Sequence, residues 1–275
     1  MARWTVDEPT KIDFNGVVAL KANIVAGTVS VLPTSDRPTL HVSEISGHPL
    51  EISHEAGMLS ITQKSSGVEG ILRWLQNTRG RTAITITVPA DCPVTLNLVT
   101  ANAIVTGMTG RVSVKTASGD VTLDGVTGSV DANTATGTVE AQGLGGSMIF
   151  NSVSGDLAVA HGVVERLQAH SVSGKITTDV DLHDAAGVQI RTVSGEVTMR
   201  LPKSTSAKVA LLSVGGRVDA AFDGLGREDR PVGKSVTGTL GDGAASLNVN
   251  SVSGAITLLS RPDPEALKRE GEHDR

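Results

Sequence analysis

Residues 152–155 read Ser-Val-Ser-Gly, and the same four residues return at 171–174 and 251–254, with Thr-Val-Ser-Gly at 192–195. A serine close to a glycine can mark a catalytic nucleophile. A nucleophile elbow, however, has a glycine two residues before its serine, which this motif lacks, and an enzyme does not need the same nucleophile many times. The recurrence therefore indicates a corner that the chain makes again and again.

An alignment on the last residue of this motif, position 0, extends the repeat over much of the chain. Successive positions 0 are 16 to 22 residues apart, with a mean of about 19. Glycine occupies all but the first of them. The nine positions are Ala103, Gly119, Gly137, Gly155, Gly174, Gly195, Gly216, Gly238 and Gly254.

The residues around position 0 form chemical columns. Position −3 always carries a hydroxyl, in Thr100, Thr116, Thr134, Ser152, Ser171, Thr192, Ser213, Ser235 and Ser251. Position −2 is always alanine or valine, and position +2 is always aliphatic, in Val105, Val121, Val139, Leu157, Ile176, Val197, Val218, Leu240 and Ile256. Stacked coils place each residue against its own kind, so we expect the apolar columns to face a core and glycine to supply a positive φ at the corner.

These columns predict an all-β fold, a single-chain parallel β-helix (β-solenoid) with about nine regular coils of about 19 residues. Composition agrees, because the chain has 31 glycines and only 2% aromatic residues, so its core must be filled by aliphatic side chains. We expect right-handed coils, the hand that parallel crossovers prefer.

Three segments are predicted along the chain. Residues 1–98 form irregular N-terminal coils or a cap, with a short helix near 67–78 that follows a capping box at Ser66 and Glu69. Residues 99–260 form the regular solenoid, and residues 261–275 are a charged, disordered tail.

Charge and targeting signals limit the compartment and the partners. The formal charge of −5 offers no general attraction to nucleic acid, and the single cysteine, Cys92, excludes an internal disulfide. The sequence shows neither a secretory leader nor a transmembrane segment. We therefore expect a cytoplasmic protein, with peripheral contact at the inner membrane left open.

The strongest candidate for chemistry is the stretch 178–187. Asp179 and Asp181 would share one face of a strand near His183 and Asp184, and a hard cation could bind such oxygens. A solvated loop is the alternative, and neighbouring coils supply no second acidic pair. The chain has no tyrosine to bind sugars. We predict no catalytic, cofactor-binding or metal-binding residues and no cofactor.

One further observation concerns a known family. The stretch 86–101, ITVPADCPVTLNLVTA, is followed by TASGDVTLDGVTGSV, SVSGDLAV, SVSGKITT and TVSGEVTM. This series resembles the putative bacterial adhesin family of β-strand-repeat proteins, a domain of unknown function. The resemblance implies a β-helical, non-catalytic module linked to the bacterial envelope and its stress responses, and it brings no catalytic residues.

The functional prediction is a non-catalytic, adhesin-like binding or scaffolding module that binds a protein partner or itself. Two alternatives stay open. One is a polysaccharide-acting β-helix enzyme with a metal site near Asp179 and Asp181, and the other is a self-assembling cytoskeletal solenoid.

Overall fold

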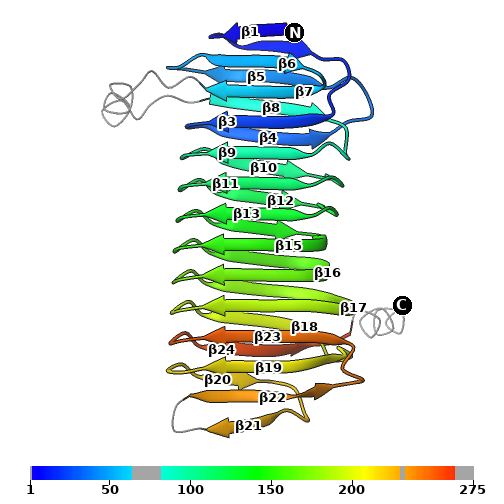
Figure 1. Cartoon of the computed structure of the whole chain (residues 1–275), viewed down its shortest axis with the longest axis vertical. Helices are drawn as coiled ribbons and strands as arrows, with labels where there is room; N and C mark the ends of the chain where they lie inside the picture. Colours follow the sequence, from blue (N-terminus) through cyan, green and yellow to red (C-terminus); the bar gives the residue numbers. More distant parts are fainter. Residues whose placement is uncertain (1, 64–81, 230–232, 264–275) are drawn as a thin grey trace, which may run out of the picture. The chain divides into compact units, whose positions relative to one another are not determined.

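The computed structural model describes residues 2–63, 82–229 and 233–263 (Figure 1). All regular elements within these ranges are β-strands, β1 to β24, and they form two compact units, Met1–Glu140 and Ala141–Arg275. The helix predicted near 67–78 lies outside the described residues, as do residues 264–275 of the predicted tail. The described ranges contain no helix with the length and apolar character that crossing a membrane requires.

The first unit contains strands of four to seven residues, and β14 (Val139–Gln142) lies at the border between the units. The others are β1 (Ala2–Val6), β2 (Thr10–Asp13), β3 (Ala19–Ile24), β4 (Thr28–Pro33), β5 (Thr39–Ile45), β6 (Leu50–Glu55), β7 (Met58–Gln63), β8 (Thr82–Val88), β9 (Val94–Leu98), β10 (Asn102–Thr106), β11 (Val112–Thr116), β12 (Val121–Asp124) and β13 (Val130–Thr134).

Two ladders of parallel strands build this unit. One runs β7–β3–β9–β11–β13, and the other runs β8–β4–β10–β12. Equivalent residues pair in register, so that Ala103 lies between Val29 and Val121. At the β7–β8 end the pairing becomes antiparallel, through β6 and β1 on one ladder and through β5 and β2 on the other.

The second unit contains the two longest strands, β16 (Leu157–Ser171) and β17 (Ile176–Thr192). The others are β15 (Gly145–Ser152), β18 (Val197–Pro202), β19 (Ala207–Ser213), β20 (Val218–Ala220), β21 (Gly226–Asp229), β22 (Lys234–Leu240), β23 (Ala245–Ser251) and β24 (Ile256–Arg261).

Two ladders build the second unit as well. One runs β15–β16–β17–β23–β19 in parallel and ends with antiparallel β22 and β21, and the other runs β16–β17–β18–β24–β20. β16 and β17 belong to both ladders because each bends halfway. His161 and Ala185 take positive φ there, and the register of β16 shifts on both sides of the bend, as at a β-bulge. Each unit is thus all-β and solenoid-like.

The order of strands in a ladder differs from their order in the sequence. β3 pairs with β7 on one side and β9 on the other, and β23 pairs with both β17 and β19 (Figure 1). The coil around Gly254, predicted to be the last, therefore lies between the coils of Gly195 and Gly216. The prediction of nine coils stacked in sequence order was wrong at this end.

Two residues assigned to position 0 are also corrected. Thr116 pairs with Leu98, so the residue equivalent to Gly119 is Ala101, two residues before the predicted Ala103. Gly238 belongs to no corner, because it lies in β22, where it pairs antiparallel with Val209. The motif Ser-Val-Thr-Gly at 235–238 matched the repeat in letters without making its turn.

The core of each ladder follows from the two-residue period of a strand. In β8, buried Thr82, Ile84, Ile86 and Val88 alternate with half-buried residues. In the second unit the corrected +2 column is buried, with Leu157, Ile176 and Val197 each 0–1% exposed. β-Branched residues suit this arrangement because a stiff side chain stacks well on its equivalent in the neighbouring strand.

Glycine is required at position 0 because of close packing between coils. Gly155, Gly174, Gly195, Gly254 and Gly216 all lack the positive φ that we expected. A Cβ added to Gly174 would overlap the backbone carbonyl of Gly155, and one added to Gly195 would overlap that of Gly174. A side chain at this column would therefore push neighbouring coils apart.

This packing generates a stability prediction. Gly195→Ala should lower the free energy of unfolding by about 1–3 kcal/mol, the usual cost of overpacking. Gly187→Ala is the matched control, because the atom nearest to its added Cβ is 4.0 Å away, and we expect almost no change. Urea denaturation followed by circular dichroism measures both. Equal stability of the two variants would contradict the packing argument.

Candidate functional site

The corner is held within each coil by the hydroxyl at position −3. The amide of Gly174 donates to Oγ of Ser171 at 2.9 Å, and the amide of Gly195 donates to Oγ1 of Thr192 at the same distance. Ser171 and Thr192 are both buried. In these coils the hydroxyl predicted at position −3 is thus an internal cap for the turn. Ser251 is buried at the same position without a hydrogen-bond partner among the described residues, and Thr100 and Ser235 fall outside the corrected column.

Hydrogen bonds between coils fix the same corner. The amide of Ser194 donates to the carbonyl of Val172 at 2.8 Å, and its hydroxyl donates to the same oxygen at 3.2 Å. Ser253 repeats both bonds to the carbonyl of Val193, at 2.8 and 3.2 Å. These valine carbonyls are therefore satisfied inside the protein, and the corner turns its side chains outward from a fixed backbone.

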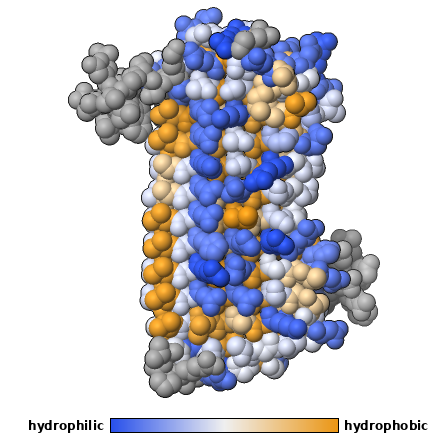
Figure 2. Space-filling view, in the orientation of Figure 1, coloured by the Kyte–Doolittle hydropathy of each residue, from blue (hydrophilic) through white to orange (hydrophobic). Residues whose placement is uncertain are grey.

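Position −2 forms a row of exposed valines in the second unit, which we call the valine column. An apolar row follows the edge at which β16, β17 and β23 end (Figure 2). Exposed fractions of these side chains lie between 47% and 57%. In stacking order the column consists of Val153, Val172, Val193, Val252 and Val214.

The outward direction of this column was not predicted. We expected every apolar column to face the core, yet positions −3 and 0 occupy the interior of the corner and leave position −2 outside. The signal was present in the sequence, since a polar and a glycine column flank the valines. In the first unit Val99 takes the equivalent position and is 41% exposed.

Position +1, three residues after each valine, is charged in four of these five coils. The stacking order at this position is Asp156, Lys175, Glu196, Ala255 and Arg217. Nζ of Lys175 is 3.9 Å from Oε2 of Glu196, and these side chains are 54% and 53% exposed. Opposite charges thus alternate over Asp156, Lys175 and Glu196, and Ala255 separates Glu196 from Arg217.

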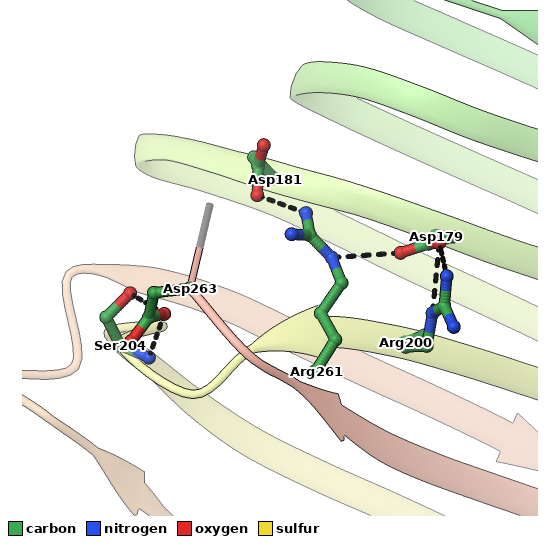
Figure 3. Close-up of polar contacts among 6 residues, drawn as sticks. All are labelled: Asp179, Asp181, Arg200, Ser204, Arg261 and Asp263. Carbon is green, nitrogen blue, oxygen red and sulfur yellow. Dashed lines mark hydrogen bonds and ion pairs between the residues drawn. The ribbon is translucent and has the colours of Figure 1, made fainter. Parts of the chain in front are cut away.

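The predicted acidic pair lies elsewhere in the second unit and is bound by arginines (Figure 3). Arg200 of β18 donates through Nε to Oδ2 of Asp179 at 2.9 Å and contacts the same oxygen through Nη2. Arg261 of β24 reaches across β18, with Nε 3.0 Å from Oδ1 of Asp179 in an ion pair and Nη2 2.5 Å from Oδ1 of Asp181. Both carboxylates therefore face guanidinium groups.

The electrostatics of this cluster favour a structural role. The hydrogen bond from Arg200 is the largest cause and lowers the pKa of Asp179. Burial, the next largest, raises it, and the positive charges of Arg200 and Arg261 then lower it, so the net shift is downward. In the described ranges no three histidine, cysteine or acidic side chains come together as a metal site would need. His183 and Asp184, which the sequence placed beside the pair, are exposed.

Asp263, two residues after Arg261, makes a second contact that holds the end of β24. Oδ1 of Asp263 accepts hydrogen bonds from the amide and the hydroxyl of Ser204, at 3.0 and 2.6 Å. These bonds lower the pKa of Asp263. These contacts tie the end of β24 to β17 and to the turn that follows β18, so they hold the coil that is inserted out of sequence order.

The single cysteine offers no reactive site. Cys92 is 3% exposed, and burial, with the nearby charge of Asp91, raises the pKa of its thiol to about 11. The thiol therefore stays protonated at neutral pH, when thiolate is the reactive form.

The fold defines an all-β, solenoid-like domain, and comparison with known proteins names its family. Residues 27–259 match the model of the Toastrack DUF4097 family, a domain of unknown function, and the chain belongs to this family. The match to this family model confirms the resemblance drawn from the repeat. No curated protein matches the chain.

Two crystal structures show similarity at low identity. A putative cell adhesion protein from Clostridium sporogenes ATCC 15579 has 16% identity and a TM-score of 0.28, with coverage of 92% of this chain and 100% of that one. A putative lipid binding protein from Parabacteroides distasonis ATCC 8503 has 14% identity and a TM-score of 0.47, with coverage of 91% and 96%.

The arginine cluster generates a pH prediction. Because the pKa of folded Asp179 is lowered, its contribution to stability is present above the unfolded pKa of about 4 and is lost as pH falls through the folded value. Asp179→Asn should be less stable than wild type at pH 7, and the difference should shrink below pH about 4.

Thermal unfolding between pH 7 and pH 2 provides the measurement. Asp184→Asn, an exposed carboxylate in the same segment, is the control and should follow the wild-type curve. A stability difference for Asp179→Asn that stays constant across the range would show that the carboxylate contributes nothing through its charge.

Proposed function

We propose that this chain is a non-catalytic β-solenoid binding or scaffolding module and that it binds through the valine column of its second unit. The observation that carries the proposal is the row of five valines, each about half exposed, in which the carbonyls of Val153, Val172, Val193 and Val252 already accept backbone hydrogen bonds from the next coil. Apolar side chains presented this regularly do not stabilise the core. They contribute free energy when a partner covers them.

The corner gives the surface its rigidity. Neighbouring valines directly follow the ends of parallel strands that pair in register, about 4.8 Å apart, and hydrogen bonds within and between coils fix each turn. A partner would therefore meet a row that needs little ordering on binding, which lowers the entropic cost of association.

The chemistry of the other candidate sites supports a binding role over an enzymatic one. The repeated serines cap turns, the acidic pair faces two arginines, and Cys92 is buried with a raised pKa. The polysaccharide-acting alternative depended on Asp179 and Asp181 as metal ligands, and their arginine partners compete with that role.

Hydrophobic-interaction chromatography tests whether the column is an apolar binding surface. Val172→Ser with Val193→Ser should elute distinctly earlier from a phenyl resin than wild type, because the change divides a continuous apolar row. Val18→Ser with Val163→Ser is the matched control, since it also removes two exposed valines, 63% and 51% exposed, outside the column. We expect a smaller shift for the control.

Both double variants should unfold at nearly the wild-type temperature, since surface substitutions usually change stability by less than about 0.5 kcal/mol. Equal elution of the two double variants, with both folded, would refute a special role of the column.

A further inference from the structure

We infer that the partner of the valine column is a second copy of this chain, packed column to column in antiparallel orientation. The inference rests on the proposed function, since it identifies what covers the same surface. It is carried by the neighbouring opposite charges of Lys175 and Glu196 at position +1, because reversing the order of coils about the step between them opposes each lysine to a glutamate.

Consider a two-fold axis that lies in the plane of the contact and is perpendicular to the column. It places the position +1 side of one copy against the position +1 side of the other, and it reverses the order of coils. Centred between the coils of Val172 and Val193, it places Val172 of each copy opposite Val193 of the other. Val153 then lies opposite Val252. Four valines from each copy meet in register, because both columns have the same strand spacing.

The charges and the number of opposed valines together select this register among the antiparallel ones. An axis through Val252 would oppose Glu196 to Arg217 but would bring only three valines of each copy together, and an axis between Val153 and Val172 would bring only two. With the axis between Val172 and Val193, Lys175 of each copy lies opposite Glu196 of the other, and Asp156 lies opposite Ala255. An axis through Val193 would place Glu196 opposite itself, and an axis through Val172 would do the same to Lys175. Like charges opposed in this way weaken association and specify against the wrong register.

The available area sets the strength of the contact. Four half-exposed valines supply roughly 100–250 Å² of apolar surface per copy, from the transfer energy of a valine side chain. A standard interface buries roughly 800 Å² per partner. The dimer should therefore be weak and reversible, formed at high local concentration, which suits a scaffold that assembles where many copies gather.

Sedimentation velocity of the full chain over a wide concentration range tests the inference. Wild type should shift from monomer toward dimer as concentration rises, whereas Val172→Ser with Val193→Ser should stay monomeric. Val18→Ser with Val163→Ser should associate as wild type does. A wild-type monomer at every concentration, or a dimer that persists in the column variant, would overturn the inference.

A charge exchange gives a signature that altered folding cannot imitate. Lys175→Glu alone and Glu196→Lys alone should each associate less than wild type, because each places like charges opposite one another. An equimolar mixture of these two variants should recover a dimer, since every acidic residue at these positions then meets a lysine of the other variant. Two variants that associate no better together than apart would contradict the charge register.

A lipid surface is the competing outcome. Pelleting with vesicles of phosphatidylglycerol and phosphatidylcholine distinguishes it, and we expect wild type to stay in the supernatant. Binding to vesicles that requires Val172 and Val193, from a protein that stays monomeric, would refute the second copy and retain the apolar binding surface. If the two double variants elute equally from the phenyl resin while both are folded, the valine column is not an apolar binding surface, and the proposed function is refuted as well.

Discussion

Contact between backbones at the glycine corner is the constraint on which the rest of the structure depends. Gly174 packs against the carbonyl of Gly155, and Gly195 packs against that of Gly174, at separations that leave no room for a Cβ. Coils can then approach to strand-pairing distance at their corners as well as in their ladders. The hydroxyl three residues earlier holds the turn by accepting a hydrogen bond from the glycine amide.

The exposed valines follow from that corner. Once glycine and the hydroxyl residue occupy the inside of the turn, the two residues between them must face outward. A serine at position −1 satisfies the carbonyl of a neighbouring coil, as Ser194 does for Val172. The valine at position −2 has no comparable structural task. The same geometry that closes the coil therefore creates a straight apolar row, and this links the fold to the proposed binding role.

Much of the architecture could be predicted from the repeat, because a solenoid imposes the same chemistry on every coil. The all-β class, the turn at each glycine and the buried +2 column around Ile176 follow from spacing and residue type. The order of coils could not be predicted for the same reason. Equivalent coils have nearly identical faces, so local pattern does not show that the coil of Gly254 inserts between those of Gly195 and Gly216. Arg261 and Asp263 hold that insertion through contacts that no local motif encodes.

Cysteine cross-linking tests the in-register corner and its order most directly. Ser194 and Ser253 occupy position −1 in adjacent coils, whereas Ser194 and Gly215 are separated by a coil, or about 9.6 Å at two strand spacings. The account predicts that Ser194→Cys with Ser253→Cys forms an intramolecular disulfide on mild oxidation of the dilute folded protein, and that Ser194→Cys with Gly215→Cys does not, since disulfides need Cα atoms within about 7 Å. Peptide mapping by mass spectrometry identifies the bond. A cross-link between positions 194 and 215, with none between 194 and 253, would contradict the account.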